Sequence, residues 1–232
     1  MKVAVFGAGT MGSGIAQVFA AHGHTTLMYA SSVASAQRHK DKLDASLQKR
    51  VEKGKMTQEA KDALMANIFV EEKSAAADAD LVIECAKEEM AYKRAMLSEL
   101  DGLCKESTIF ATNTSSLSVT EMGLGLKHPV IGMHFFNPVP SMKLVEIIRG
   151  ANTTQETFDV IYKQPVEVAE APGFVVNKIL IPMINEAIGL VETGVASVED
   201  IDKAMMLGAN HPMGPLALGD FIGLDVCLAI MN

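Results

Sequence analysis

A glycine-rich loop near the start of the chain constrains the fold most strongly. The run Lys2–Phe6 is rich in β-branched residues, and the loop Gly7-Ala8-Gly9-Thr10-Met11-Gly12 follows it at once. Apolar residues then recur at helical spacing until Gly23, and a second apolar run covers Thr25–Tyr29. A strand, a glycine turn, a helix and a strand in this order are typical of the opening of a doubly wound parallel sheet.

A physical requirement explains the glycine at each of three positions in this loop. In such a turn Gly7 permits the tight bend, Gly9 lets the backbone approach a pyrophosphate, and Gly12 lets the helix pack close to the strand. The amino terminus of the helix adds N–H groups that bind anions. We therefore expect the whole loop, Gly7, Ala8, Gly9, Thr10, Met11 and Gly12, to bind a dinucleotide. A glycine turn without a ligand is the alternative.

The end of the second apolar run lacks the acidic residue that usually binds the ribose of NAD. That residue normally stands about 20 residues after the loop and accepts a hydrogen bond from the 2′-hydroxyl. Here the position holds Ala30, followed by Ser31 and Ser32. Serine hydroxyls donate to a 2′-hydroxyl or to a 2′-phosphate. We expect Ala30 and Ser31 to border the ribose and the cofactor to be NAD, with NADP as an open alternative.

The rest of the first part predicts a sheet with one helical insertion. Residues 35–66 are helical and charge-rich with a break at Gly54, which indicates a helical hairpin inserted between strands. The helix Glu88–Leu100 separates two later strands. Sheet-like apolar runs occur at Ile68–Val70, Leu81–Glu84, Thr108–Ala111, Val130–Met133, Leu144–Ile148 and Val166–Ala169. Most are continuous, as expected where helices cover both faces of a parallel sheet.

A hinge at Ala171-Pro172-Gly173 separates this part from a helical one. Beyond it the pattern predicts one long helix over Phe174–Glu192, a helix start at Ser197 and another helix near Gly214-Pro215. We predict an α/β fold with two domains. A Rossmann-type, doubly wound NAD(P)-binding domain covers residues 1–171 and includes the hairpin near 35–66. An all-helical substrate and dimerisation domain, apparently truncated, covers residues 172–232.

The second domain is too short for a comfortable independent core. We therefore expect a homodimer through this domain, with apolar side chains buried against the second subunit. They include Ile181, Ile184, Ile188, Leu190, Leu216, Leu218 and Leu228.

Charge and composition exclude several classes of function. With 20 Lys and Arg against 28 Asp and Glu, the formal charge is −8, which gives no general attraction to nucleic acid or to an anionic membrane. No apolar run reaches the roughly 18 residues of a membrane span, and the glycine loop comes too early for a signal peptide. The cysteines Cys85, Cys104 and Cys227 are odd in number, scattered and without metal-ligand spacing. They favour a cytoplasmic protein without a metal site.

Three polar segments follow or flank predicted strands, where an open α/β sheet builds its site. They are Asn113-Thr114-Ser115-Ser116, His134-Phe135-Phe136-Asn137-Pro138 and Leu144-Val145-Glu146. Glu146 stands within an apolar strand, and a buried carboxylate there needs a partner. A hydrogen-bonded core histidine without a catalytic role is the alternative for His134.

Together with the glycine loop, Pro172–Asn177 and His211–Pro215, these segments resemble the L-3-hydroxyacyl-CoA dehydrogenases. The likeness is strongest to the bacterial 3-hydroxybutyryl-CoA dehydrogenases of butyrate metabolism and covers nearly the whole chain. Two departures stand out besides Ala30. The stretch between Thr157 and Pro165 is several residues shorter than in the family, and the chain stops at Asn232, before the family's usual end.

The resemblance implies roles for single residues. His134 corresponds to the catalytic base and Glu146 to the carboxylate that orients it. Ser115 and Asn177 correspond to polar residues that contact substrate and nicotinamide. The other implied cofactor-binding residues are Glu88 and Lys93, near the nicotinamide ribose, and Asn113 and Asn137, which line the same cleft.

On the helical hairpin, Ser46 and Lys53 correspond to contacts with the CoA moiety. The nearby Lys49, Arg50 and Lys55 add positive charge to this surface. A local basic surface on an acidic protein suits the binding of CoA phosphates. Without the resemblance, these residues would be interpreted as an ordinary solvated helix face.

The resemblance therefore implies hydride transfer between a nicotinamide cofactor and a 3-hydroxyacyl-CoA, with 3-hydroxybutyryl-CoA and acetoacetyl-CoA as the expected pair. Two alternatives stay open. A sugar-acid or other β-hydroxyacid dehydrogenase has the same two-domain plan, and a nucleotide-binding protein without catalysis would share the glycine loop. The pairing of His134 with Glu146 and the basic hairpin speak against the first. The intact set of Ser115, His134, Glu146 and Asn177 speaks against the second.

Overall fold

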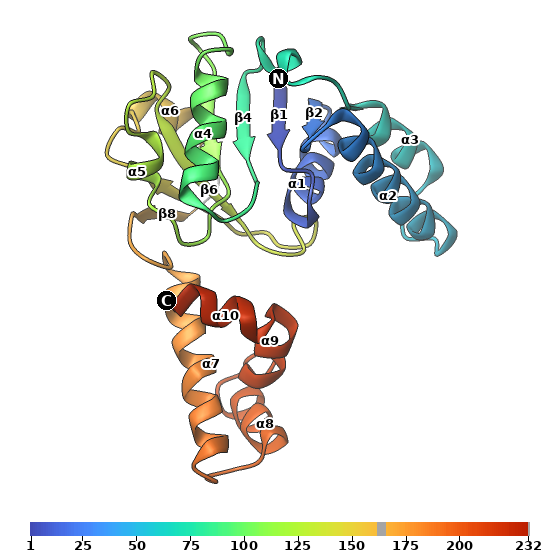
Figure 1. Ribbon diagram of the computed structural model, residues 1–232. Helices are drawn as coiled ribbons and strands as arrows, with labels where there is room; N and C mark the ends of the chain where they lie inside the picture. The colour runs from blue at the N-terminus through green and yellow to red at the C-terminus, as the bar shows by residue number, and fades with distance from the viewer. Residues whose placement is uncertain (162–165, 232) are drawn as a thin grey trace. The chain divides into compact units, whose positions relative to one another are not determined.

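Figure 1 shows a computed structural model of the chain, which describes residues 1–161 and 166–231. The chain divides into two compact units, one up to Glu170 and one from Ala171 onward. The first contains the sheet and the helices packed on it, and the second is helical. The α/β fold class predicted from the sequence is confirmed.

The sheet has eight strands in the order β3-β2-β1-β4-β5-β6-β7-β8. They are β1 (Lys2–Phe6), β2 (Thr25–Tyr29), β3 (Ile68–Phe69), β4 (Leu81–Glu84), β5 (Ile109–Thr112), β6 (Val130–Phe135), β7 (Val145–Arg149) and β8 (Val166–Ala169). Neighbouring strands run parallel except β6 and β7, which are antiparallel. The connection over residues 136–144 contains no helix, and a parallel crossover needs a dozen or more residues. The sheet is therefore mostly parallel, as expected for a doubly wound fold, and the pairing of β6 with β7 is the antiparallel exception.

Helices cover both faces of the sheet, which explains its continuous apolar strands. On one face, α1 (Thr10–Ala21), α3 (Gln58–Ala66) and α6 (Gln155–Ile161) share a core with alternate residues of the strands, Val3, Val5, Ile83 and Ile131 among them. On the other face lie α4 (Met90–Asp101) and α5 (Val119–Gly123). Side chains at the intervening strand positions, such as Glu84 and His134, point to this second face.

The helical hairpin predicted near residues 35–66 consists of α2 (Val33–Glu52) and α3. It stands between β2 and β3, beside the sheet (Figure 1). Ser32 caps α2 through a hydrogen bond that its Oγ accepts from the N–H of Ser35, and Thr57 caps α3 in the same way. Leu43, Leu47 and Leu64 bury their side chains in the core of the first unit. A short 3₁₀ helix, η1 (Lys73–Ala76), follows the hairpin and β3.

The second unit contains α7 (Val176–Glu192), α8 (Val198–Gly208), α9 (Pro215–Ile222) and α10 (Leu224–Met231). Ser197 caps α8 as expected, since its Oγ accepts from the N–H of Asp200. Asp202 reaches from α8 to the start of α9, where its carboxylate accepts from the N–H groups of Leu216 and Ala217 at 2.8 and 2.9 Å. The buried core is small: Ile181, Ile184 and Cys227, with Leu218, Ile222 and Ile230 packed around them.

The sequence patterns missed three short helices, α5, α6 and α10, because fewer than nine residues show too little periodicity. The shortened stretch noted between Thr157 and Pro165 falls partly on residues 162–165, outside the described residues. Among the residues that the structure describes, no helix is long and apolar enough to span a bilayer.

Candidate active site

The glycine loop connects β1 to α1 at the carboxyl edge of the sheet, and its three glycines meet different constraints. Gly7 has φ 109°, and a Cβ there would lie 2.5 Å from the backbone of Cys85. At Gly12 a Cβ would lie 1.9 Å from the carbonyl oxygen of Gly7. At Gly9 a Cβ would meet nothing within 4 Å. The chain itself therefore requires glycine at Gly7 and Gly12, whereas at Gly9 the open space is available to a ligand.

The first turn of α1 is suited to an anion. Gly9 is its N-cap, no side chain caps the helix, and no acidic residue stands in its first turn. The N–H groups of that turn and the positive end of the helix dipole then face the exposed side of Gly9. This arrangement fits the pyrophosphate of a dinucleotide, and it brings Gly7, Ala8, Gly9, Thr10, Met11 and Gly12 into one turn as expected.

The expected ribose position lies directly after β2. Ala30 is half-buried and Ser31 is exposed. The hydroxyl of Ser32 accepts from the N–H of Ser35 at 3.1 Å as the cap of α2. Of the two serines considered at this position, Ser31 is the one whose hydroxyl is not used as a helix cap.

His134 and Glu146 form a buried pair across the antiparallel strands β6 and β7. The two residues stand directly opposite each other in the register. Nδ1 of His134 donates to Oε2 of Glu146 at 2.6 Å. The side chains are only 6% and 1% exposed, and the ring of Phe136 lies 4.5 Å from the imidazole, centroid to centroid. The carboxylate therefore sets the orientation of the imidazole and stabilises a positive charge on it.

Glu88 holds the segment that carries Ser115. Oε1 of Glu88 accepts from the backbone N–H of Ser115 at 2.8 Å, and it also contacts the hydroxyls of Thr114, Ser115 and Ser116. Oε2 of Glu88 lies 3.2 Å from Nζ of Lys93. Glu88, Lys93 and Ser115, predicted from separate segments, are thus brought together.

Asn113 and Asn137 have different environments. Oδ1 of Asn113 accepts from the N–H of Phe135 at 2.9 Å, which ties the end of β5 to the end of β6. Asn137 is exposed on the loop between β6 and β7, before a cis peptide bond to Pro138. The next residue, Val139, packs against Gly14 of α1, where an added Cβ would lie 3.0 Å from Cβ of Val139. The loop after His134 therefore contacts the helix that follows the glycine loop.

The remaining predicted residues lie apart from these groups. Ser46 and Lys53 are exposed on α2 and at its C-cap, and their seven-residue spacing puts them on one side of the helix. Within residues 1–161 and 166–231, no hydrogen bond joins either side chain to another predicted site residue. Asn177 belongs to the second unit, in the first turn of α7, and is half-buried.

Sequence reasoning missed Glu84 and Thr112. Glu84 ends β4, is fully buried and binds Lys93 and Thr112 through its carboxylate. The sequence feature that could have identified Glu84 is the one that identified Glu146: a carboxylate within an apolar strand, which needs a partner when it is buried.

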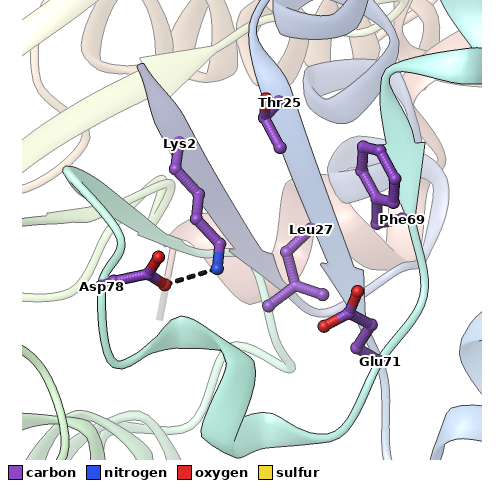
Figure 2. A pocket seen from close by; sticks show the side chains of 6 residues that line it. All are labelled: Lys2, Thr25, Leu27, Phe69, Glu71 and Asp78. Carbon is purple, nitrogen blue, oxygen red and sulfur yellow. Dashed lines mark hydrogen bonds and ion pairs between the residues drawn. The ribbon is translucent and has the colours of Figure 1, made fainter.

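A cavity of about 300 Å³ lies elsewhere, where β1 and β2 begin. Figure 2 shows its lining, in which the ammonium of Lys2 points to Asp78, and Leu27 lies between this pair and Phe69. None of the predicted site residues lines it. In the described part of the chain, no group of three metal-ligating side chains is present.

Family models match the chain over both of its units. The NAD-binding domain of 3-hydroxyacyl-CoA dehydrogenase matches residues 2–173, and the C-terminal domain of the same family matches residues 173–232. The chain belongs to the 3-hydroxyacyl-CoA dehydrogenase family. This membership confirms the resemblance found in the sequence.

Individual relatives agree with this family. A 3-hydroxybutyryl-CoA dehydrogenase of Clostridioides difficile is 54% identical over 100% of this chain and 86% of its own length. A probable 3-hydroxybutyryl-CoA dehydrogenase of Bacillus subtilis is 49% identical over 100% of this chain and 84% of its length. The crystal structure of (S)-3-hydroxybutyryl-CoA dehydrogenase from Ralstonia eutropha, at 44% identity, superposes with a TM-score of 0.93 and covers 99% of this chain and 85% of that one.

Proposed function

We propose that this chain interconverts L-3-hydroxyacyl-CoA and 3-ketoacyl-CoA by hydride transfer with a nicotinamide cofactor. The expected physiological pair is 3-hydroxybutyryl-CoA and acetoacetyl-CoA. The observation that carries the proposal is the buried pair of His134 and Glu146, which can exchange one proton with a substrate oxygen. Family membership and full-length similarity to 3-hydroxybutyryl-CoA dehydrogenases support the choice of substrate.

His134 handles the proton in either direction. In oxidation the imidazole takes the proton of the 3-hydroxyl while the hydride leaves C3; in reduction the imidazolium returns a proton to the forming alkoxide. Because Nδ1 is bound to Glu146, this exchange falls to Nε2. Glu146 keeps the ring in place and stabilises the imidazolium. Ser115 and Asn177 are proposed to contact the substrate and the nicotinamide.

The glycine loop and the end of β2 would hold the cofactor, which supplies the hydride acceptor or donor. The open N–H groups of α1 fit its pyrophosphate, and Ala30 and Ser31 would border the adenosine ribose. Glu88 and Asn137 are proposed to lie near its nicotinamide half, with Asn113 beside them. We propose NAD as the preferred cofactor with weak discrimination against NADP, because Ala30 neither binds the 2′-hydroxyl nor repels a phosphate.

Ser46 and Lys53 on α2 are proposed to bind the CoA phosphates. Lys49, Arg50 and Lys55 lie around them, so this end of the hairpin is basic on a chain with a net charge of −8. Exposed contacts of this kind are screened by salt.

The first experiment measures NADH oxidation with acetoacetyl-CoA and, in parallel, with free acetoacetate. We expect turnover of the CoA ester, little turnover of the free acid, and a KM for the ester that rises with salt. Equal kcat/KM for ester and free acid would favour a general β-hydroxyacid dehydrogenase. Binding of NADH without turnover of either compound would favour a non-catalytic nucleotide-binding protein.

We further propose that the second unit contains substrate-contacting residues and forms a homodimer. Ile181, Ile184 and Leu218, which the sequence suggested for the interface, pack inside the unit instead. Ile188, Leu190 and Leu228 are 39%, 42% and 54% exposed. These three side chains, with the small internal core, support an apolar contact with a second copy.

A reducing cytoplasm is the proposed location. Cys85, Cys104 and Cys227 are free thiols. Burial raises the pKa of Cys104 to about 11 and raises that of Cys85 further. Thiols held protonated react slowly with oxidants.

A further inference from the structure

Gly14 stands in the second turn of α1, where the backbone itself does not require a glycine. It lies within the α-helix and is not among the glycines with positive φ. Alanine adopts this backbone conformation more readily, because glycine in the interior of a helix loses more conformational freedom on folding. The reason for a glycine at this position therefore lies outside the helix.

The side chain of Val139 lies against the bare backbone of Gly14. A Cβ at Gly14 would lie 3.0 Å from Cβ and 3.1 Å from Cγ2 of Val139, and 3.7 Å from Cδ of Pro140. Two carbon atoms attract each other best at about 3.5–4.0 Å, so the first two distances are too short. At the helical Gly208, by contrast, a Cβ would meet nothing within 4 Å. The loop approaches α1 this closely because position 14 has no side chain.

Val139 anchors the loop 136–144 between β6 and β7. It is 6% exposed and belongs to the core of the first unit. Among residues 136–144, all of which the structure describes, it is the one buried residue. The chain turns tightly around it, because the carbonyl oxygen of Pro138 accepts from the N–H groups of Ser141 and Met142 at 2.9 and 3.1 Å. The position of the loop therefore depends on one buried side chain and on the surface against which that side chain packs.

The contact between Gly14 and Val139 joins two parts of the candidate site. The loop leaves β6 after His134, carries Asn137, and returns to β7, where Glu146 stands opposite His134. On the other side of the contact, α1 begins with the turn proposed for the pyrophosphate of the cofactor. The contact therefore lies between the helix proposed for the cofactor and the two strands that carry the proton-exchanging pair.

We propose that Gly14 is a positioning residue, whose missing side chain lets Val139 pack directly on α1 and so holds the loop 136–144 in place. The contact sets the spacing between α1 and the strands that carry His134 and Glu146. Catalysis depends steeply on such spacing, since a displacement of about 1 Å can lower a rate about 100-fold. The effect on catalysis rests on the proposed function, whereas the effect on the loop does not.

The test combines Gly14→Ala with Val139→Gly, singly and together. Gly14→Ala adds a methyl group against Val139 and keeps a good helix former in α1. Val139→Gly removes Cβ and Cγ2, the two atoms that this methyl group would approach most closely. Gly208→Ala is the matched control, because it adds the same methyl group to a helical glycine with open space around it. Each protein is assayed for thermal unfolding, amide hydrogen exchange over residues 136–144, the Kd of NADH, and kcat with acetoacetyl-CoA.

We expect Gly14→Ala to lower kcat about tenfold, because the added methyl group displaces Val139 by less than about 1 Å. Amide exchange over residues 136–144 should become about tenfold faster, because the loop is held less firmly. The Kd of NADH should change little, since the first turn of α1 is unaltered.

Val139→Gly should also lower kcat, because the loop loses its anchor. Adding Gly14→Ala to Val139→Gly should lower kcat no further, because the methyl group has no side chain left to displace. Gly208→Ala should match the parent in all four measurements.

Three results would overturn the proposal. If Gly14→Ala leaves the loop exchange and kcat at the parent values, the contact does not set the position of the loop. If Gly14→Ala lowers kcat or the unfolding temperature equally in the parent and in the Val139→Gly background, Gly14 acts through another neighbour. If the Kd of NADH rises and kcat at saturating NADH does not fall, Gly14 serves the cofactor site alone.

Absence of turnover in the parent would refute the proposed function instead. The exchange rates of the loop in the single and double variants would then still decide whether Gly14 positions the loop through Val139.

Discussion

At the scale of single residues, the site depends on carboxylates that hold other groups rather than on isolated reactive side chains. Glu146 holds His134 across two strands, and Glu88 holds Ser115 at the end of β5. Asn113 is a neutral example, since its side chain fixes the backbone of Phe135. Glu146 is buried and Asn113 is half-buried, whereas the side chain of Glu88 is 38% exposed.

The pairing of His134 with Glu146 predicts a non-additive loss of activity. His134→Ala should lower kcat by about 10²- to 10⁴-fold, the usual cost of losing an acid–base group. Glu146→Gln should also lower kcat, because the imidazolium loses its counter-charge. The double variant should be little worse than His134→Ala alone, since the two residues act as one unit. Steady-state kinetics of the single and double variants measure this effect. If the two losses in kcat multiply, the residues act separately. His22→Ala, at an exposed histidine, serves as the control.

Replacing Ala30, the residue after β2, is expected to change the cofactor preference. Ala30→Asp introduces a carboxylate that accepts from the 2′-hydroxyl of NADH and repels the 2′-phosphate of NADPH. The ratio of kcat/KM for NADH over that for NADPH should rise by tenfold or more, mainly through a loss with NADPH (about 1.4 kcal/mol for each tenfold change). A parent protein with negligible NADPH activity would contradict this expectation.

At the scale of elements, the turn between β1 and α1 contains a glycine that the fold requires and a glycine that the fold does not require. Gly12 is required by the carbonyl of Gly7, whereas Gly9 meets only open space. Gly9 has φ −65°, which alanine also adopts.

This difference predicts opposite outcomes for two alanine substitutions. Gly9→Ala should leave thermal unfolding nearly unchanged and raise the Kd of NADH, since the methyl group enters the space proposed for the pyrophosphate. Gly12→Ala should lower the free energy of unfolding by at least about 1–3 kcal/mol through overpacking. Calorimetry and NADH titration measure the two effects. Unchanged NADH affinity in Gly9→Ala would show that the cofactor does not bind at this turn.

The connection between β6 and β7 is the other element that shapes the site. Because it contains no helix, β7 returns antiparallel and places Glu146 opposite His134. A helical crossover at the same place would have made β7 parallel and moved its first residues to the opposite edge of the sheet.

At the scale of the whole molecule, the small core of the second unit predicts self-association. In light scattering at micromolar concentration, this chain should have twice its own mass of 24.8 kDa. Ile188→Glu should shift it toward the monomer, because a charge enters the proposed apolar contact. Val160→Glu on α6 also replaces an exposed aliphatic side chain, 51% exposed, by a carboxylate, and it should not. A monomeric parent protein would refute the dimer.

Partly buried carboxylates with lowered pKa predict acid sensitivity of the first unit. Burial opposes ionisation of Asp101, but the N–H groups of His128 and Lys127 and the His128 ring outweigh it, so the pKa of Asp101 is lowered. A carboxyl whose pKa is lower in the folded state stabilises the fold above its unfolded pKa, and that stability is lost as pH falls through the folded value. The same sign holds for Glu170, which binds Ser118 and Thr120.

Urea unfolding of Asp101→Asn at two pH values tests this sign. The substitution should cost about 1.5–3 kcal/mol at neutral pH, the range for hydrogen bonds to a charged group. It should cost less near pH 3, below the pKa of Asp in the unfolded chain, because part of the stability that the lowered pKa provides is already lost there. Glu99→Gln is the matched control, because its ion pair with Lys73 is exposed and exposed pairs contribute little. An equal cost at both pH values would show that the charge of Asp101 is not involved.

Local patterns in the sequence were sufficient for much of this protein. The strand, turn and helix from Lys2 to Tyr29 follow from β-branched residues, glycine and helical spacing, and β1, β2, β4 and β8 have the predicted bounds. The motifs that identified the family also lie within short segments. In all these cases the determining interactions are between residues close in the chain, so spacing alone reveals them.

Only the tertiary structure decided which of these residues act together. The antiparallel return of β7 pairs His134 with Glu146, and the packing of α4 on the sheet buries Lys93 between Glu84 and Glu88. The tertiary structure of the second unit also buries Ile181 and Ile184, while Ile188 stays exposed. Strand direction, burial and the use of each hydrogen-bond donor depend on contacts between distant segments, and no local pattern contains them.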